Sequence, residues 1–313
     1  MCYNVSRGGN GPHGFYIAFL KGKIMIIRKK ALMKDYTSFK IGGPADVLVE
    51  PKDIKELVEL IKFLRKQGII YYIFGNGTNL LVSDKGVRGC VVRIGKNLSK
   101  IKVNGNKIEA EAGASLAEIA QVALKNGLQG FEELSGIPGT IGGALAMNAG
   151  AYEKEIRDVF SSANAINEDG RVVKLSKDAM NFSYRKSAVS DGKFIVTQVI
   201  INLQEGDKKE IQKNMERYRE LRRKVQPIDM PSAGSTFKRP ENGYASRLID
   251  QCHLKGERIG GAEVSDLHAG FIVNVGNAKA MDVYKLAEKV KSDVKAYFNT
   301  DLEFEVKLWG KFK

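Results

Sequence analysis

Two glycine-rich segments constrain the fold of this chain more than any other feature of its sequence. The longer one, residues 136–152, reads GIPGTIGGALAMNAGAY and carries almost no polar side chain before Asn148. The shorter one, residues 74–81, reads FGNGTNLL. Glycine weakens regular helices and strands, and it is favoured where backbone approaches a ligand closely and offers bare N–H groups to phosphate. Because each segment follows an apolar run, the pair predicts a site for one large, phosphate-bearing cofactor.

Composition indicates an ordinary soluble globular protein of two or three compact units, with 313 residues, 43% hydrophobic and 27% charged. The apolar stretch Phe15–Ile27 is too short to span a membrane, contains two lysines and lacks a small-residue cleavage site. It therefore predicts neither a membrane helix nor a secretory signal. Three cysteines, Cys2, Cys90 and Cys252, have no metal-type spacing. They predict no structural disulfide, as in a reducing cytoplasm.

The chain is strongly basic, with a formal net charge of +14. Such a charge favours either a polyanion partner or phosphorylated small molecules. The basic clusters Arg28–Lys30 and Arg217–Lys224 belong to no recognisable nucleic-acid motif. A solvated basic surface is therefore favoured over a nucleic-acid interface.

Periodicity and turn residues predict alternating strands and helices from residue 35 onward. A helix is expected from Ile54 until Gly68, and then a buried strand, Ile69–Phe74, that leads into the shorter glycine segment. Ser115 and Glu118 form a capping box that predicts a helix ending near Gly127. Further strands are expected at 45–49 and 91–94, and hairpins at 100–111 around Asn104-Gly105 and at 163–175 around Asp169-Gly170.

A highly charged helix at 208–224 is expected to link this part to a second unit. That unit is predicted to contain a strand at Phe271–Val275, a helix at Ala278–Phe298 and a final strand at Leu302–Leu308. Residues 1–34 show no periodic pattern that links them to a core. We expect an N-terminal extension, mobile or translated from a start upstream of Met25 or Met33, and assign it no function.

Three short segments carry residues suited to chemistry. Arg185, in FSYRKS, suits a carboxylate because guanidinium binds it bidentately, although a surface arginine explains the hexapeptide alone better. Ser235, in AGSTF, is a candidate proton donor or part of a tight turn, and no histidine stands in a triad-like context. Glu305 faces away from the apolar side of the C-terminal strand, which is also typical of a solvated strand face.

These segments occur in a fixed order that resembles the UDP-N-acetylenolpyruvoylglucosamine reductase (MurB) family. The order is DYTSFKIGGP at 35–44, GNGTNL at 75–80, SGIPGTIGGA at 135–144, NAGAY at 148–152, YRKS at 184–187, AGSTF at 233–237 and EVKLWG at 305–310. The resemblance covers about residues 35–310. Because no long insertion follows Tyr184-Arg185, the chain resembles the type II branch of the family.

The resemblance implies an α/β (α+β) fold: an FAD-binding domain of the vanillyl-alcohol-oxidase/PCMH type with two subdomains, 35–207, and a smaller substrate domain, 208–313. It implies a cytoplasmic oxidoreductase of peptidoglycan synthesis. The expected reaction is NADPH-dependent reduction of UDP-N-acetylglucosamine enolpyruvate to UDP-N-acetylmuramate through noncovalent FAD. The expected partners are these small molecules, with no nucleic acid, membrane or metal.

The resemblance also implies roles for individual residues. Arg185 and Glu305 are expected to flank the enolpyruvyl group, and Ser235 to donate the proton. Substrate contacts are expected from Tyr152, Arg239 and His268. The residues expected to bind FAD are Gly75, Asn76, Gly77, Thr78, Asn79, Leu80, Gly136, Ile137, Pro138, Gly139, Ile141, Gly142, Gly143, Asn148, Ala149 and Gly150.

Two other functions remain open from the sequence. One is an oxidase of the same flavin fold acting on a small alcohol or sugar, and the other is a basic nucleotide-binding module without turnover. An FAD spectrum separates the module from both enzymes. Bleaching by NADPH with slow reoxidation in air separates the reductase from the oxidase.

Overall fold

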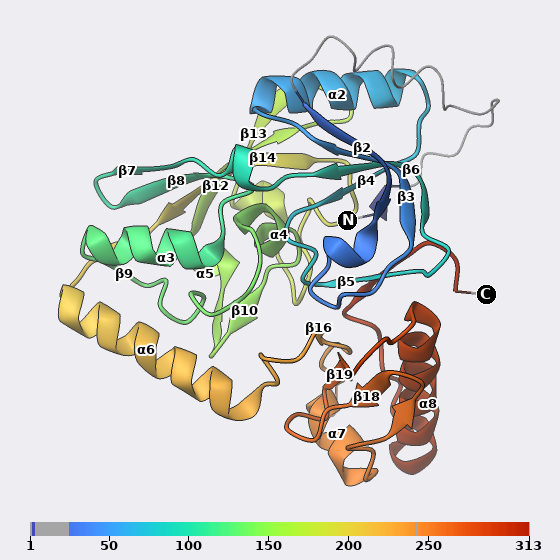
Figure 1. Cartoon of the computed structure of the whole chain (residues 1–313). Helices are drawn as coiled ribbons and strands as arrows, with labels where there is room; N and C mark the ends of the chain where they lie inside the picture. The colour runs from blue at the N-terminus through green and yellow to red at the C-terminus, as the bar shows by residue number, and fades with distance from the viewer. Residues whose placement is uncertain (1, 4–24, 242, 313) are drawn as a thin grey trace. The chain divides into compact units, whose positions relative to one another are not determined.

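The computed structural model describes residues 2–3, 25–241 and 243–312, and the chain divides into two compact units (Figure 1). Unit 1 contains the described residues up to Ala31, together with Asp46–Gly75 and Gly89–Tyr218. Unit 2 contains Leu32–Ala45, Asn76–Arg88 and the residues from Arg219 onward. The expected domains, 35–207 and 208–313, are continuous stretches, whereas both units are assembled from separate stretches of chain. The expected linker, helix α6 (Lys208–Val225), contains the boundary within it.

Most of a five-stranded sheet, in the order β1-β4-β6-β3-β2, belongs to unit 1. Its strands are β1 (Cys2–Tyr3), β2 (Ile26–Leu32), β3 (Pro44–Glu50), β4 (Tyr71–Phe74) and β6 (Val87–Arg93). The pair β4 and β6 is parallel. Helix α2 (Ile54–Lys66) begins at Asp53, whose side chain accepts the Glu56 N–H, and buries its leucine face in the core of the unit. The expected helix and the strand that follows it are confirmed.

A second five-stranded sheet of unit 1, β13-β12-β14-β8-β7, is antiparallel throughout. Its strands are β7 (Ile101–Asn104), β8 (Lys107–Glu111), β12 (Phe160–Ile166), β13 (Val172–Ser176) and β14 (Ile195–Asn202). Both expected hairpins, β7–β8 and β12–β13, are confirmed. Helix α3 (Leu116–Lys125) begins with the expected capping box of Ser115 and Glu118. The capping box and the hairpin turns each consist of residues only a few positions apart. These elements could therefore be predicted without knowing any distant contact.

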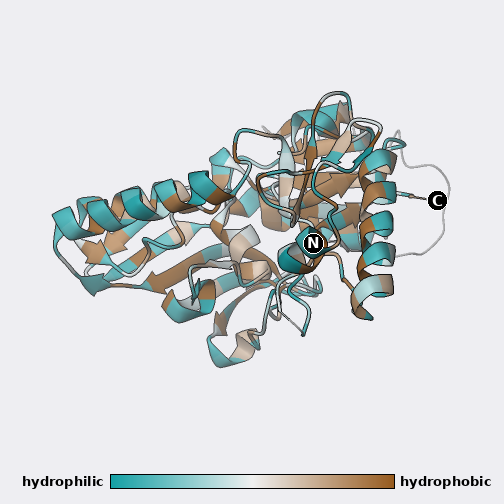
Figure 2. Ribbon diagram, turned by 90° about the horizontal axis from the view of Figure 1, so that it is seen from below, coloured by the Kyte–Doolittle hydropathy of each residue, from teal (hydrophilic) through white to brown (hydrophobic). Residues whose placement is uncertain are grey.

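Shorter elements complete unit 1. They are β9 (Leu128–Gln129) paired with β15 (Gln204–Glu205), β10 (Gly150–Ala151) paired with β11 (Lys154–Glu155), α4 (Ile141–Ala146), α5 (Ile156–Val159), η2 (Lys96–Leu98) and η3 (Asp178–Met180). Figure 2 shows strands that are mostly hydrophobic and helices on which hydrophilic and hydrophobic residues alternate. This pattern is expected where helices bury one face only.

The N-terminal expectation requires a correction. Residues 26–32, expected within an unattached extension, form strand β2 at the edge of the first sheet, and Met25 and Met33 are buried. The sequence IIRKKAL shows no apolar alternation because only Ala31 of this strand is buried. Lysines on an edge strand discourage pairing with other chains. Because these lysines interrupt the apolar alternation, the sequence pattern does not predict the strand. Residues 1 and 4–24 of the expected extension lie outside the described residues.

Unit 2 is built around a four-stranded antiparallel sheet in the order β16-β19-β18-β17. Its strands are β16 (Ser232–Ser235), β17 (Arg258–Ile259), β18 (Ala262–Val264) and β19 (Phe271–Asn274). Helices α7 (Ala245–Gln251) and α8 (Ala280–Phe298) pack together, and α8 also packs on β17 and β18. The 3-10 helix η1 (Met33–Asp35) also belongs to this unit. The apolar core joins α8 to Phe39, Ile41 and Leu81 from distant parts of the sequence.

The expected final strand, Leu302–Leu308, is shorter and displaced. Strand β20 spans Lys307–Trp309 and runs parallel to β5 (Leu80–Val82), and Phe304 forms only an isolated bridge with Phe237. The predicted alternation nevertheless exists in burial, because Leu302 and Val306 are buried whereas Glu303 and Lys307 are exposed. A local pattern shows which side chains point inward but not where a distant partner strand is available.

Candidate functional site

The two glycine-rich segments contact each other within unit 1. Gly75 directly follows β4, and a Cβ atom at this position would lie 2.3 Å from Thr140 Oγ1. Thr140 is the N-cap of α4, and its hydroxyl accepts the Gly143 N–H at 3.3 Å. Any side chain at residue 75 would therefore push the segments apart. Gly75 and the start of α4 therefore lie side by side within unit 1.

The first amides of α4 are engaged within the protein. Ile141 N donates to Ala114 O at 2.8 Å, and Gly142 N donates to Ala112 O at 2.9 Å. A Cβ at Gly142 would lie 2.8 Å from Ala112 Cβ. This corrects the expectation that Ile141 and Gly142 present bare N–H groups to a phosphate. Gly142 is required because α4 packs closely on the segment before α3.

Apart from Tyr152 at its end, the exposed residues of the longer segment are Gly136 and Pro138, among half-buried neighbours, and Gly143, between buried ones. A Cβ at Gly143 would meet only Thr140 Oγ1, at 3.4 Å. These three exposed positions, called the rim below, carry no long side chain, and Gly143 lies next to Thr140. Backbone without long side chains suits a cofactor that lies close to it.

The remainder of the shorter segment belongs to unit 2, where it is held by the chain around Ser38. Gly77 has φ +65°, and its carbonyl accepts the Ser38 N–H at 3.3 Å. The Ser38 hydroxyl donates to Ser232 O at 2.6 Å. Ser232 begins β16, the strand that ends at Ser235. Ser38 therefore joins the glycine segment to the strand that carries a predicted catalytic residue.

The backbones of Ser235 and Glu305 lie close together in unit 2. Glu305 N donates to the carbonyl oxygen of Thr236, the residue after Ser235, at 2.9 Å. Both are partly exposed. The carbonyl of Glu305 accepts the Asn79 side-chain amide at 3.2 Å, and Asn79 O accepts Lys307 N at 3.0 Å. Asn79, expected to bind FAD, thus also fixes the backbone of Glu305.

Arg185 lies in unit 1, in a tight turn closed by reciprocal backbone hydrogen bonds between Ser183 and Lys186. Arg185 has φ +53°, an uncommon conformation for a side chain of this size. Its guanidinium lies 4.9 Å from the Tyr184 ring centroid and donates from Nη2 to Gly150 O at 3.4 Å. Since Arg185 and the pair Ser235 and Glu305 belong to different units, their meeting in one site stays a prediction.

Asn148, expected to bind FAD, is fully buried and bonded within the protein. Its amide nitrogen donates to Glu155 Oε2 at 2.9 Å and to Ser183 O at 3.1 Å, and its oxygen accepts Arg157 N at 3.1 Å. Both amide hydrogens are therefore engaged. Asn148 supports the turn of Arg185, a role that the sequence did not indicate.

The three expected substrate residues have distinct surroundings. Tyr152 packs against Tyr218 with ring centroids 4.8 Å apart. Arg239 stacks over Tyr244 at 4.2 Å. His268 is partly buried, its Nδ1 accepts Gly270 N at 3.1 Å, and burial lowers its pKa. Tyr152 belongs to unit 1, and the other two belong to unit 2.

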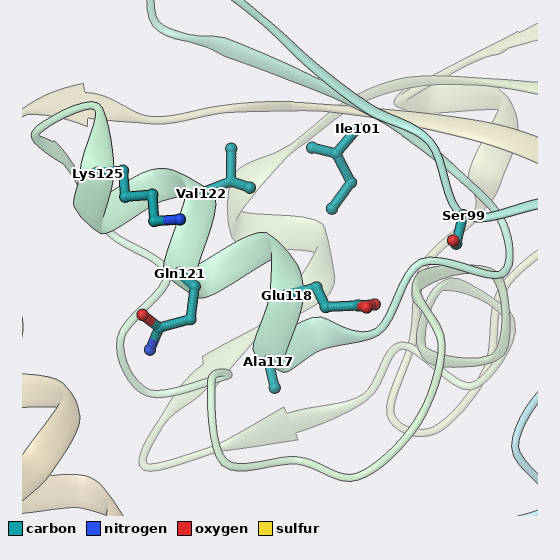
Figure 3. A pocket seen from close by; sticks show the side chains of 7 residues that line it. All are labelled: Ser99, Ile101, Ala117, Glu118, Gln121, Val122 and Lys125. Carbon is teal, nitrogen blue, oxygen red and sulfur yellow. The ribbon is translucent and has the colours of Figure 1, made fainter. Parts of the chain in front are cut away.

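A separate open cavity of about 450 Å³ lies beside α3 (Figure 3). Figure 3 shows Glu118, Gln121 and Lys125 on α3, with Ser99 and Ile101 opposite. Hydrogen bonds from Ser115 occupy the Glu118 carboxylate and lower its pKa. The cavity contains none of the predicted site residues. Among the described residues, no group of side chains is suited to hold a metal ion and no helix is long and apolar enough to cross a membrane.

Comparisons with known proteins agree with these observations. A family profile described as an FAD binding domain matches residues 45–176, and one described as the C-terminal domain of UDP-N-acetylenolpyruvoylglucosamine reductase matches 226–309. A reductase of that name from Caldanaerobacter subterraneus subsp. tengcongensis is 51% identical over 278 residues, 89% of this chain and 92% of the relative. The Clostridium kluyveri relative is 45% identical over 278 residues, 89% of this chain and 91% of its own length.

A solved structure shows the same architecture. The crystal structure of the reductase from Thermus caldophilus matches with a TM-score of 0.80 and 36% identity, covering 92% of this chain and all of that one. Together with the FAD-binding profile, this match confirms the expected α+β fold class, a PCMH-type FAD-binding domain followed by a smaller C-terminal domain.

Proposed function

The chain belongs to the UDP-N-acetylenolpyruvoylglucosamine reductase family, and we propose that the residues described above perform the reaction of that family in the following way. The reaction is the NADPH-dependent reduction of UDP-N-acetylglucosamine enolpyruvate to UDP-N-acetylmuramate through bound FAD, in peptidoglycan precursor synthesis. The observation that carries this function is the 51% identity with a reductase of that name over 89% of the chain.

FAD supplies the hydride when bound, after its own reduction by NADPH. We assign its binding to the contact between Gly75 and Thr140 and to the exposed rim of Gly136, Pro138 and Gly143. The absence of long side chains on this rim supports the assignment, because the cofactor can lie close to backbone there. The other residues expected to bind FAD, from both glycine segments, remain part of the proposal. Ile141, Gly142 and Asn148 are the exceptions, because they support the surrounding chain through their contacts within the protein.

Arg185 is assigned to the substrate carboxylate. Hydride addition to the vinyl carbon develops negative charge next to that carboxylate, and a fixed guanidinium stabilises such charge most effectively where water is excluded. Ser235 holds the proton that reaches the neighbouring carbon, and Glu305 hydrogen-bonds the carboxylate when protonated. The adjacency of Ser235 and Glu305 across Thr236 supports a shared role for these two residues.

We also propose that Tyr152, Arg239 and His268 contact the UDP-sugar and that the enzyme acts in the cytoplasm on small molecules alone. The pairs Tyr152 with Tyr218 and Arg239 with Tyr244 support the first proposal, because aromatic rings and stacked guanidinium groups suit a nucleotide. The free cysteines Cys90 and Cys252 are consistent with a reducing compartment.

The test follows the flavin absorbance of the purified protein, first without oxygen and then in air. We expect an FAD spectrum that NADPH bleaches and that UDP-N-acetylglucosamine enolpyruvate restores within the time of one turnover. Air should restore the colour far more slowly than this substrate does. Rapid reoxidation by air with no response to the enolpyruvyl sugar would instead identify the oxidase, and a colourless protein would leave the nucleotide-binding module.

A further inference from the structure

Glu155 is a partly buried carboxylate that neither the sequence nor the proposed reaction has assigned. It ends strand β11 and pairs with Gly150 of β10, and its side chain is 16% exposed. The guanidinium of Arg185 also contacts Gly150, through the carbonyl oxygen. Glu155 and Arg185, 30 residues apart in sequence, therefore meet at one small hairpin within unit 1.

The two oxygens of Glu155 have different partners. Oε2 accepts Asn148 Nδ2 at 2.9 Å and lies 2.8 Å from Arg157 Nε. Oε1 lies 3.9 Å from Arg185 Nη1. Because Asn148 is buried and bonded through its oxygen as well, it holds the carboxylate in one orientation. That orientation directs Oε1 to Arg185.

Both terminal nitrogens of Arg185 therefore have a partner at this hairpin. Nη1 faces Glu155, and Nη2 donates to the carbonyl of Gly150. A guanidinium is planar and rigid, so that contacts at both terminal nitrogens restrict the rotation of the whole group. An arginine without such contacts would lose considerable rotational entropy on binding a carboxylate.

We infer that Glu155 is a positioning residue, which orders the Arg185 guanidinium before the enolpyruvyl carboxylate arrives. This inference rests on the proposed role of Arg185. Glu155 touches neither substrate nor cofactor in this assignment, and it acts through Arg185. Its charge also balances Arg157 and Arg185, which both face its carboxylate.

The experiment compares Glu155→Gln with Glu153→Gln in the FAD-loaded enzyme. Glu153 lies on the same hairpin, is exposed and receives the same change. We expect Glu155→Gln to slow flavin reoxidation by UDP-N-acetylglucosamine enolpyruvate by about tenfold to a hundredfold, as misplaced catalytic groups do. Flavin reduction by NADPH should change by less than about twofold in both variants.

A double-mutant cycle with Arg185→Ala separates positioning from general support of the fold. In the Arg185→Ala background, Glu155→Gln should add less than about twofold to the loss, because the residue through which it acts is gone. An equal effect in both backgrounds would overturn the inference, as would a Glu155→Gln enzyme that reoxidises like the Glu153→Gln control. FAD content and the melting temperature show whether each variant is folded. If Arg185→Ala itself leaves reoxidation unchanged, the failure lies in the proposed role of Arg185 and not in its positioning.

Discussion

Ser235 is the last residue of β16. The carbonyl oxygen of the next residue, Thr236, accepts the Glu305 N–H. If Ser235 donates the proton, Ser235→Ala should leave flavin reduction by NADPH intact and slow reoxidation by the enolpyruvyl substrate. General acids contribute about 10²–10⁴-fold, which sets the expected loss. Stopped-flow absorbance of the flavin measures both half-reactions separately.

The matched control is Ser232→Ala, three residues earlier on the same strand, which should leave both rates unchanged. Equal slowing of the two half-reactions by Ser235→Ala would indicate a structural role.

Two neighbouring glycines of α4 offer a test at the scale of one element. Gly142→Ala places a methyl group 2.8 Å from Ala112 Cβ, and overpacking of this kind typically costs about 1–3 kcal/mol of unfolding free energy. Gly143→Ala places it on the exposed side, where replacing a helical glycine gains about 0.5–1 kcal/mol. Urea unfolding of the flavin-free variants measures both effects. If the exposed rim binds FAD, Gly143→Ala should nevertheless reduce FAD retention. Unchanged FAD content in Gly143→Ala would remove this residue from the cofactor site.

The same elements show how far sequence reasoning reaches. The capping box of Ser115 and the hairpin at Asn104-Gly105 were predictable because neighbouring residues determine both. Strand β2 was not predicted because its position at the sheet edge leaves most of its side chains exposed. Strand β20 was misplaced because its partner strand lies 227 residues earlier, which no local pattern shows. In the candidate site, the chemistry of a residue type was enough to predict a carboxylate-binding candidate such as Arg185. The supporting role of Glu155 could not be predicted, since it arises only when the hairpin folds against the turn.

At the scale of the whole molecule, unit 2 depends on segments from early in the chain. Phe39, Ile41 and Leu81 are each at most 2% exposed within a core otherwise formed after residue 219. Asp84 accepts the Ala280 N–H at 2.9 Å and so caps α8 from the same early part. A fragment of residues 219–313 alone should therefore show no cooperative thermal transition by circular dichroism, because its core lacks these side chains. The full chain under the same conditions is the control, and a cooperative transition of the fragment at a similar temperature would contradict the prediction.

The parallel pairing of β5 with β20 also has a consequence for synthesis on the ribosome. Residues 80–82 leave the ribosome long before residues 307–309 have been made, so that β5 lacks this partner for most of translation. Unpaired strand edges invite association with other chains, and contacts of high sequence separation form slowly. The interval before β20 arrives is thus the time when a nascent chain has most need of a chaperone.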